Sequence, residues 1–232
     1  MNTPAPQSGE ERKLRLAIVG CGAIAEAVHM EGCLASDDVE VTLLVDRDLE
    51  RARKMAEKFG IAEVSESVTD VKNHAEAALL ALPNHLHASI AIELLRGGTH
   101  VLVEKPLATR TADCEAICRA AGESGAVLAT GLICRLYPNL EFVRQALRDG
   151  LIGDLVSYDV RQGFPIEAWP VASDYLLRRE EAGGGVLMDL GIHLLDFLQL
   201  CLGMPEKIDY RDDAHGGVEA NCIMTVSHPG GA

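Results

Sequence analysis

The sequence predicts an α/β fold, in which a Rossmann-type, doubly wound parallel sheet is followed by an α+β domain with an antiparallel sheet. Three observations predict it. Short apolar, β-branched runs alternate with helical stretches over the first 130 residues, a glycine-rich turn follows the first run, and the alternation changes beyond residue 131. Near-continuous apolar strands separated by helices are typical of a parallel sheet that is covered on both faces.

The strands of the first domain are expected at residues 14–19, 40–45, 76–82, 99–103 and 126–130. Helices are expected between them, most clearly over 48–59 and 85–96, where apolar residues recur every three to four positions. Gly60 and Gly97-Gly98 follow these two helices, where a glycine C-cap is expected. Residues 1–11 are polar and contain two prolines, so we expect a disordered leader and a first domain over 12–131.

The second domain is expected over residues 132–232. A helix at 138–149, a strand at 155–163, an irregular segment (FPIEAWP), a helix at 186–202 and strands at 206–212 and 218–227 follow one another. The chain ends in SHPGGA, which is typical of a hairpin turn. We therefore expect the antiparallel sheet to be incomplete and the sequence to be truncated at its C-terminus.

The composition excludes several classes of function. Acids outnumber bases 35 to 21, for a net charge of −14, which disfavours nucleic acid or a membrane surface as the main partner. No apolar run is expected to reach the length of a membrane span. The seven cysteines form no CxxC pair or Cys/His cluster, so no metal is expected, and free thiols in this number suggest the cytoplasm.

The strongest local signal is Gly20-Cys-Gly-Ala-Ile-Ala25, directly after the first expected strand. Gly20 permits a tight turn, Gly22 leaves room for a pyrophosphate, and Ala25 lets the helix pack close to the sheet. Asp46 ends the second strand, where it can accept hydrogen bonds from the adenosine ribose and would repel a 2′-phosphate. NAD is therefore favoured over NADP, although the adjacent Arg47 could pair with a phosphate. The alternative is an ordinary glycine turn with an unrelated surface aspartate.

Two further segments carry chemical groups. Glu104-Lys105-Pro106 follows the fifth expected strand, at the end of the sheet where doubly wound folds bind ligands. Asp189 and His193 are four residues apart on an otherwise apolar helix, and Asp196 continues their stripe. Buried ionisable groups are costly unless they line a site or pair internally. A solvated Lys105, and an Asp189–His193 pair inside the core, are the alternatives.

Together these segments resemble the Gfo/Idh/MocA family of glucose–fructose oxidoreductases and inositol dehydrogenases. The resemblance rests on GCGAIA, ALPNHLH (81–87), VLVEKPLA (101–108) and GGGVLMDLGIHLLD, and it covers the chain from Leu14 to about His228. It implies that Lys105, Asp189 and His193 are catalytic. It also implies that Arg135 and Tyr137 approach the substrate.

The glycine turn and the end of the second strand predict a first set of cofactor-binding residues, which are Gly20, Gly22, Ala23, Ile24, Asp46 and Arg47. The resemblance implies a second set, which is Leu82, Asn84, His87, Glu104 and Lys105.

The resemblance implies an NAD(P)-dependent oxidoreductase that acts on a sugar, inositol or related polyol. His193 would act as general base and Lys105 would stabilise charge on the same oxygen, while Asp189 would orient the hydroxyl or the imidazole. A reductase of another carbonyl or imine, and a non-catalytic nucleotide-binding module, are the alternatives. A small-molecule substrate is expected, with no nucleic acid or membrane partner. A homo-oligomer is expected if the second domain is complete.

Overall fold

The computed structural model describes residues 12–163, 165 and 174–229, which divide into two compact units. The first unit contains residues 12–81, 90–102 and 120–128. The second contains residues 82–89 and 103–119 and the described residues from 129 onward. The segments after residues 81 and 102 therefore group with the C-terminal half of the chain.

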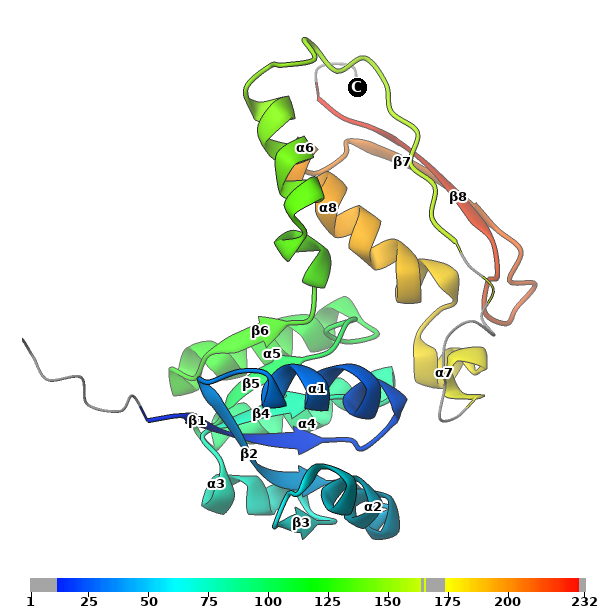
Figure 1. Ribbon diagram of the computed structural model, residues 1–232. Helices are drawn as coiled ribbons and strands as arrows, with labels where there is room; N and C mark the ends of the chain where they lie inside the picture. Colours follow the sequence, from blue (N-terminus) through cyan, green and yellow to red (C-terminus); the bar gives the residue numbers. More distant parts are fainter. Residues whose placement is uncertain (1–11, 164, 166–173, 230–232) are drawn as a thin grey trace, which may run out of the picture. The chain divides into compact units, whose positions relative to one another are not determined.

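Six strands form one sheet in the order β3-β2-β1-β4-β5-β6 (Figure 1). The strands are β1 (Leu14–Val19), β2 (Val39–Val45), β3 (Val64–Ser65), β4 (Ala77–Leu80), β5 (His100–Val103) and β6 (Leu128–Thr130). Strand β1 pairs in parallel with both β2 and β4, and β2 pairs in parallel with β3. This is the strand order of a doubly wound dinucleotide-binding sheet. The predicted fold class is confirmed, and only the two-residue strand β3 had no clear sequence signal.

The core of the first unit lies between this sheet and the helices of the first 81 residues. These helices are a π-helical turn (Ala25–His29), α1 (Met30–Leu34), α2 (Leu49–Phe59) and α3 (Val71–His74). Ile18, Leu44 and Leu79 pack from the strands against Ala25 and Met30 from the helices. Ala25 is fully buried, as its expected role in close helix–sheet packing requires.

The helix boundaries follow the local sequence. Asp48 caps α2 by accepting a hydrogen bond from the Arg51 N–H, and Gly60 ends the helix with φ +73°. Helix α4 (His87–Arg96) ends before Gly98, which has φ +82°. A left-handed residue at these positions favours glycine because a Cβ atom would be strained there. Both predicted glycine caps are confirmed.

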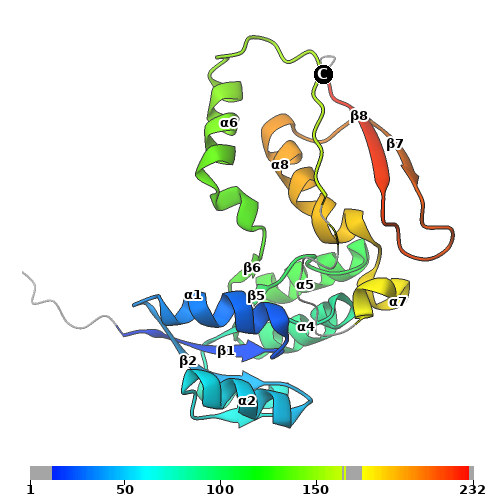
Figure 2. The ribbon, with the colours of Figure 1, turned by 45° about the vertical axis from the view of Figure 1, so that its right-hand side comes forward.

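The remaining helices and the second sheet come later in the chain. They are α5 (Thr111–Ser124), α6 (Pro138–Arg148), α7 (Arg179–Ala182), a π-helical turn (Leu187–Gly191), α8 (Ile192–Leu202), β7 (Lys207–Asp212) and β8 (Cys222–Ser227). Strands β7 and β8 form an antiparallel hairpin. Helix α8 lies between α6 and this hairpin in both ribbon views (Figures 1 and 2).

The strand predicted at 155–163 is wrong. These residues form no strand in the described part of the chain. Their alternating pattern fits a strand, but a strand also needs a neighbour that pairs with its backbone, and alternation does not supply one. The predicted strand at 218–227 is present only over β8, because residues 218–221 belong to the turn that precedes it. The expected leader and most of FPIEAWP lie outside the described residues.

The expectation about membrane spans also needs correction. The helical stretch Arg179–Leu202 has 24 residues, and its most apolar 18-residue window has a mean hydropathy of 1.6, which are the length and composition of a membrane span. Only 6% of its most apolar window is buried within the described chain. These properties alone are weak evidence, since core helices of soluble proteins share them. The stretch also carries Asp189, whose partner is described below.

Candidate functional site

The glycine turn after β1 has the geometry that a bound dinucleotide needs. Gly20 has φ +97°, and its N–H donates to the Val45 carbonyl at 2.7 Å, so the chain turns sharply at the end of β1. A Cβ atom built on Gly22 would meet nothing within 4 Å, so the space beside this residue is open. Ala23 and Ile24 begin the helical segment that leads into the π-helical turn. These residues therefore fit a pyrophosphate at a helix N-terminus.

Asp46 lies beside this turn and is 8% exposed. Its carboxylate accepts the Cys21 N–H at 2.9 Å and the Asp48 N–H at 2.9 Å, and Arg51 lies 3.6 Å away. Asp46 thus stabilises the glycine turn. This role was not predicted from the sequence, which indicated only a contact with the ribose. A carboxylate has about four acceptor positions, so two N–H donors leave capacity for a ligand. Arg47 next to it is exposed.

Lys105 and Asp189 form an ion pair. The Lys105 ammonium donates to the Asp189 carboxylate at 2.5 Å and to the Asp189 main-chain carbonyl at 2.8 Å. The Lys105 side chain is 20% exposed and that of Asp189 is 38% exposed. Asp189 lies in the π-helical turn, a feature that is frequent at functional sites. The Glu104 carboxylate accepts the Lys105 main-chain N–H at 3.0 Å. The alternative of a solvated, unpaired Lys105 is therefore wrong.

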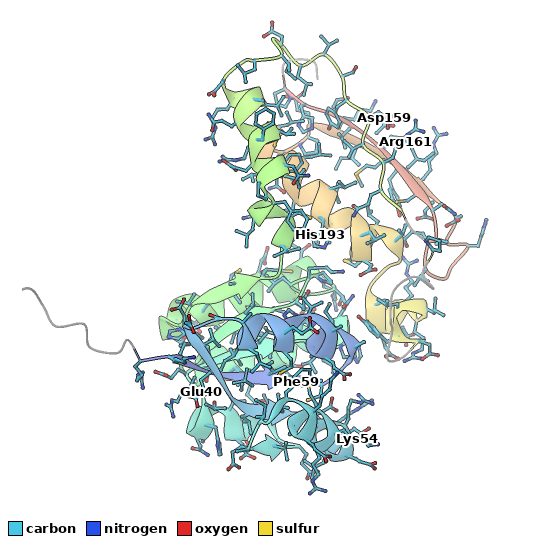
Figure 3. All side chains as sticks on the ribbon, viewed as in Figure 1. Glu40, Lys54, Phe59, Asp159, Arg161 and His193 are labelled. Atoms are coloured by element: carbon cyan, nitrogen blue, oxygen red, sulfur yellow. The ribbon has the colours of Figure 1, made fainter. Side chains whose placement is uncertain are left out.

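His193, which is labelled in Figure 3, is the second residue of α8 and follows Asp189 by four residues. Its Nδ1 atom is buried and has no hydrogen-bond partner among the described residues. Asp189 is paired with Lys105, and the alternative, a core pair of Asp189 with His193, does not form. Burial, and then the positive charge of Lys105, lower the pKa of His193 below its usual value. A neutral imidazole is the form that can accept a proton.

Tyr175 is a polar neighbour of this group that no sequence motif indicates. It lies in a short 3₁₀ turn, Asp174–Leu177. Burial and the negative charges of Asp189 and Glu104 raise the pKa of Tyr175 to about 12. The phenol therefore stays protonated beside the ion pair and can donate a hydrogen bond. No motif surrounds it, so only the fold could reveal it.

Arg135 and Tyr137, which were expected near the substrate, lie at and just after a 3₁₀ turn. The Arg135 guanidinium forms a bidentate ion pair with Asp196 of α8, with N–O distances of 2.7 and 2.5 Å. The Asp196 side chain is only 13% exposed, while that of Arg135 is 52% exposed. Tyr137 is exposed. Arg135 is therefore engaged with the helix that carries His193.

Asn84 and His87, which were expected against the cofactor, are buried and bonded to the main chain. The Asn84 amide donates to the Ala182 carbonyl at 2.8 Å. The two ring nitrogens of His87 lie 2.7 Å from the Pro106 carbonyl oxygen and 2.9 Å from that of Leu82. His87 therefore ties the chain beyond β4 to the segment that carries Lys105.

Comparisons with known proteins agree with the fold described above. Residues 14–132 match the model of the oxidoreductase family with an NAD-binding Rossmann fold, and residues 140–232 match the GFO/IDH/MocA C-terminal domain. The chain is 32% identical over 224 residues to trans-1,2-dihydrobenzene-1,2-diol dehydrogenase of Mus musculus, covering 94% of this chain and 66% of that protein. It is 30% identical over 203 residues to D-glucoside 3-dehydrogenase of Escherichia coli, covering 83% and 55%.

Solved structures are similar as well. The WlbA dehydrogenase of Bordetella pertussis, in complex with NADH and UDP-GlcNAcA, has a TM-score of 0.80 and 27% identity, covering 95% of this chain and 69% of that one. A 3-ketoreductase of Actinomadura kijaniata with NADP and TDP-benzene has a TM-score of 0.79 and 25% identity, covering 95% and 68%. The chain thus spans 66% of the length of the first curated relative named above and 55% of the length of the second. It belongs to the GFO/IDH/MocA family of oxidoreductases, and its N-terminal part is an NAD-binding Rossmann domain.

Proposed function

We propose that the protein transfers a hydride between a nicotinamide cofactor and a secondary alcohol or ketone of a sugar, inositol or related polyol. The observation that carries this proposal is the Lys105–Asp189 ion pair, with His193 one helical turn further on. The relatives support it, because they include a glucoside dehydrogenase and a structure with a bound sugar nucleotide.

The remaining hydrogen-bond capacity of Lys105 supports a role at the reacting oxygen. An ammonium group carries three donors. Two of them donate to the carbonyl and the carboxylate of Asp189. The third can donate to a substrate oxygen and stabilise negative charge as it develops there. Asp189 then fixes the direction in which Lys105 points.

His193 is the proposed general base. Its lowered pKa leaves the imidazole neutral at pH 7, so it can take the proton of a substrate hydroxyl during oxidation and return it during reduction. When bound, the nicotinamide supplies the hydride acceptor or donor. The residues of this chain that would bind the phosphates of the dinucleotide are Gly20, Gly22, Ala23 and Ile24.

We propose NAD as the preferred cofactor, with NADP as the alternative. Asp46 retains acceptor capacity for a ribose hydroxyl, and its negative charge opposes a 2′-phosphate. Arg47 is exposed and could pair with such a phosphate. Relatives of known structure bind either form, with NADH in one and NADP in another.

A reductase of another carbonyl is the second candidate. The relative that favours it is the trans-1,2-dihydrobenzene-1,2-diol dehydrogenase, which is named for a diol and not for a sugar. We also propose a cofactor domain over 12–131 and a substrate domain over 132–232, which the two family matches support. A cytoplasmic location and a homo-oligomer complete the proposal. Seven free cysteines support the first.

The experiment that tests the proposed function is a fluorescence titration with NADH and, separately, NADPH, followed by a panel of sugars, inositols and diols. NADH binding at least tenfold tighter than NADPH binding, and turnover of a polyol, would support the proposal. Equal binding would remove the NAD preference. A chain that melts cooperatively and binds neither cofactor would refute it.

A further inference from the structure

Glu219 is a buried carboxylate to which neither the sequence motifs nor the proposed reaction gives a role. It lies in the turn between β7 and β8 and is 7% exposed. Its carboxylate accepts the Gly185 N–H at 2.8 Å and the Leu187 N–H at 3.1 Å, and its main-chain carbonyl accepts the Val186 N–H at 2.9 Å. Three consecutive N–H groups are thus satisfied by one residue, at a helix start where such groups lack intrahelical partners.

The glycine sequence before this helix fits the same contact. A Cβ atom on Gly185 would lie 2.0 Å from the Glu219 carbonyl oxygen and 2.5 Å from its nitrogen, so no side chain can stand there. A Cβ atom on Gly183 would lie 2.7 Å from the Thr109 side chain. Gly183 and Gly185 therefore allow the segments that carry Thr109 and Glu219 to approach the start of the helix. Glu219 caps this helix.

A chain of hydrogen bonds connects Glu219 to Lys105. The Gly185 N–H donates to the Glu219 carboxylate, and the Gly185 carbonyl accepts the Asp189 N–H at 3.0 Å. Asp189 in turn accepts two hydrogen bonds from the Lys105 ammonium, at 2.8 and 2.5 Å. The start of the helical run therefore sets where Asp189 stands, and Asp189 sets where Lys105 points.

We propose that Glu219 is a positioning residue for the Lys105–Asp189 pair, acting through the N–H groups of Gly185 and Leu187. This inference rests on the proposed function for the roles of Lys105 and Asp189. Glu219 does not contact the substrate. Two carboxylate oxygens are required, because a glutamine would keep one acceptor and turn an N–H donor toward a second N–H.

The test compares E219Q with wild type in the full 232-residue chain, with E206Q as the matched control. Glu206 is exposed and precedes β7 of the same hairpin. Amide hydrogen exchange is measured at Leu187 and Asp189, together with NADH affinity, kcat and KM. We expect E219Q to raise exchange at both amides at least tenfold and to lower kcat by about ten- to a hundredfold, because small displacements of catalytic groups have large effects on rate. NADH affinity and E206Q should match wild type.

A second variant covers the case in which E219Q does not fold. E219D keeps the charge but is one methylene shorter, so it cannot hold both N–H groups, and the same measurements apply. The proposal would be overturned if a folded variant exchanged the Asp189 amide hydrogen at the wild-type rate. It would also be overturned if this exchange became faster while kcat stayed at the wild-type value. If wild type turns over no substrate, the proposed function fails, and exchange at Asp189 alone decides whether Glu219 positions that residue.

Discussion

Replacement of Lys105 by methionine removes the ammonium group and keeps an unbranched apolar side chain. In the structure this ammonium makes two hydrogen bonds, both to Asp189, and the two side chains are 20% and 38% exposed. A partly exposed ion pair of this kind contributes about 1 kcal/mol to stability. In a protein of this size that corresponds to a decrease in Tm of about 2–4 °C.

The expected loss of activity is much larger. A donor aimed at developing negative charge accounts for about 100- to 1,000-fold in kcat, or roughly 3–4 kcal/mol. Since the substitution leaves the glycine turn and Asp46 untouched, NADH affinity should change less than about twofold, which is under roughly 0.5 kcal/mol. K105M is therefore expected to separate turnover from both stability and cofactor binding.

The assay measures three quantities on purified K105M: NADH affinity by fluorescence titration, kcat with a substrate identified from the panel, and Tm by thermal unfolding. K72M is the matched control, because Lys72 is an exposed lysine of α3 and should behave as wild type. Wild-type turnover in K105M would refute the role of Lys105 at the reacting oxygen. A parallel loss of NADH affinity would show instead that Lys105 serves cofactor binding.

Three further predictions concern titration and cofactor choice. The positive charge of Lys105 lowers the pKa of His193, and the negative charge of Asp189 raises it. In NMR titrations of His193, K105M should therefore raise this pKa and D189N should lower it. Shifts of the same sign in the two variants would contradict this reasoning. D46N should weaken the preference for NADH over NADPH by about tenfold, or 1.4 kcal/mol, in paired titrations, and an unchanged ratio would mean that Asp46 only braces the turn. Burial lowers the pKa of His87, so below pH 6.5 the unfolded chain binds the proton that the folded chain does not. The free energy of unfolding should then fall as the pH drops from 6.5 toward this lowered pKa, by at most about 1.4 kcal/mol per pH unit, and H87Q should remove this part of the slope in urea titrations.

The parts of the site that lie close together in sequence could be predicted well. Gly20, Gly22 and Ala25 occupy one turn, and their conformational requirements are local, so the motif specifies the geometry. Asp46 was expected at the end of the second strand, and it lies there. Its hydrogen bond to the Cys21 N–H, from a residue 25 positions earlier, was not predictable from the motif.

The predictions were weakest where a residue's partner is distant in sequence. The bond between Arg135 and Asp196, which is 61 residues away, was not predicted. The segment 155–163 had a suitable pattern for a strand, but it forms none in the described part of the chain. A side-chain pattern determines which face of a segment is apolar, and it does not determine which neighbour the segment meets.

The sequence by itself therefore determined the doubly wound sheet, the glycine turn and the identity of Lys105, Asp189 and His193 as a candidate catalytic group. These features depend on hydrophobic period, glycine conformation and motif order, which are properties of short segments. The tertiary structure alone decided that Lys105 pairs with Asp189 across 84 residues and that Glu219 caps the helix start from 34 residues beyond Gly185. Contacts of this range depend on how complete elements pack, because the energy of each contact exists only after the fold has brought its two residues together.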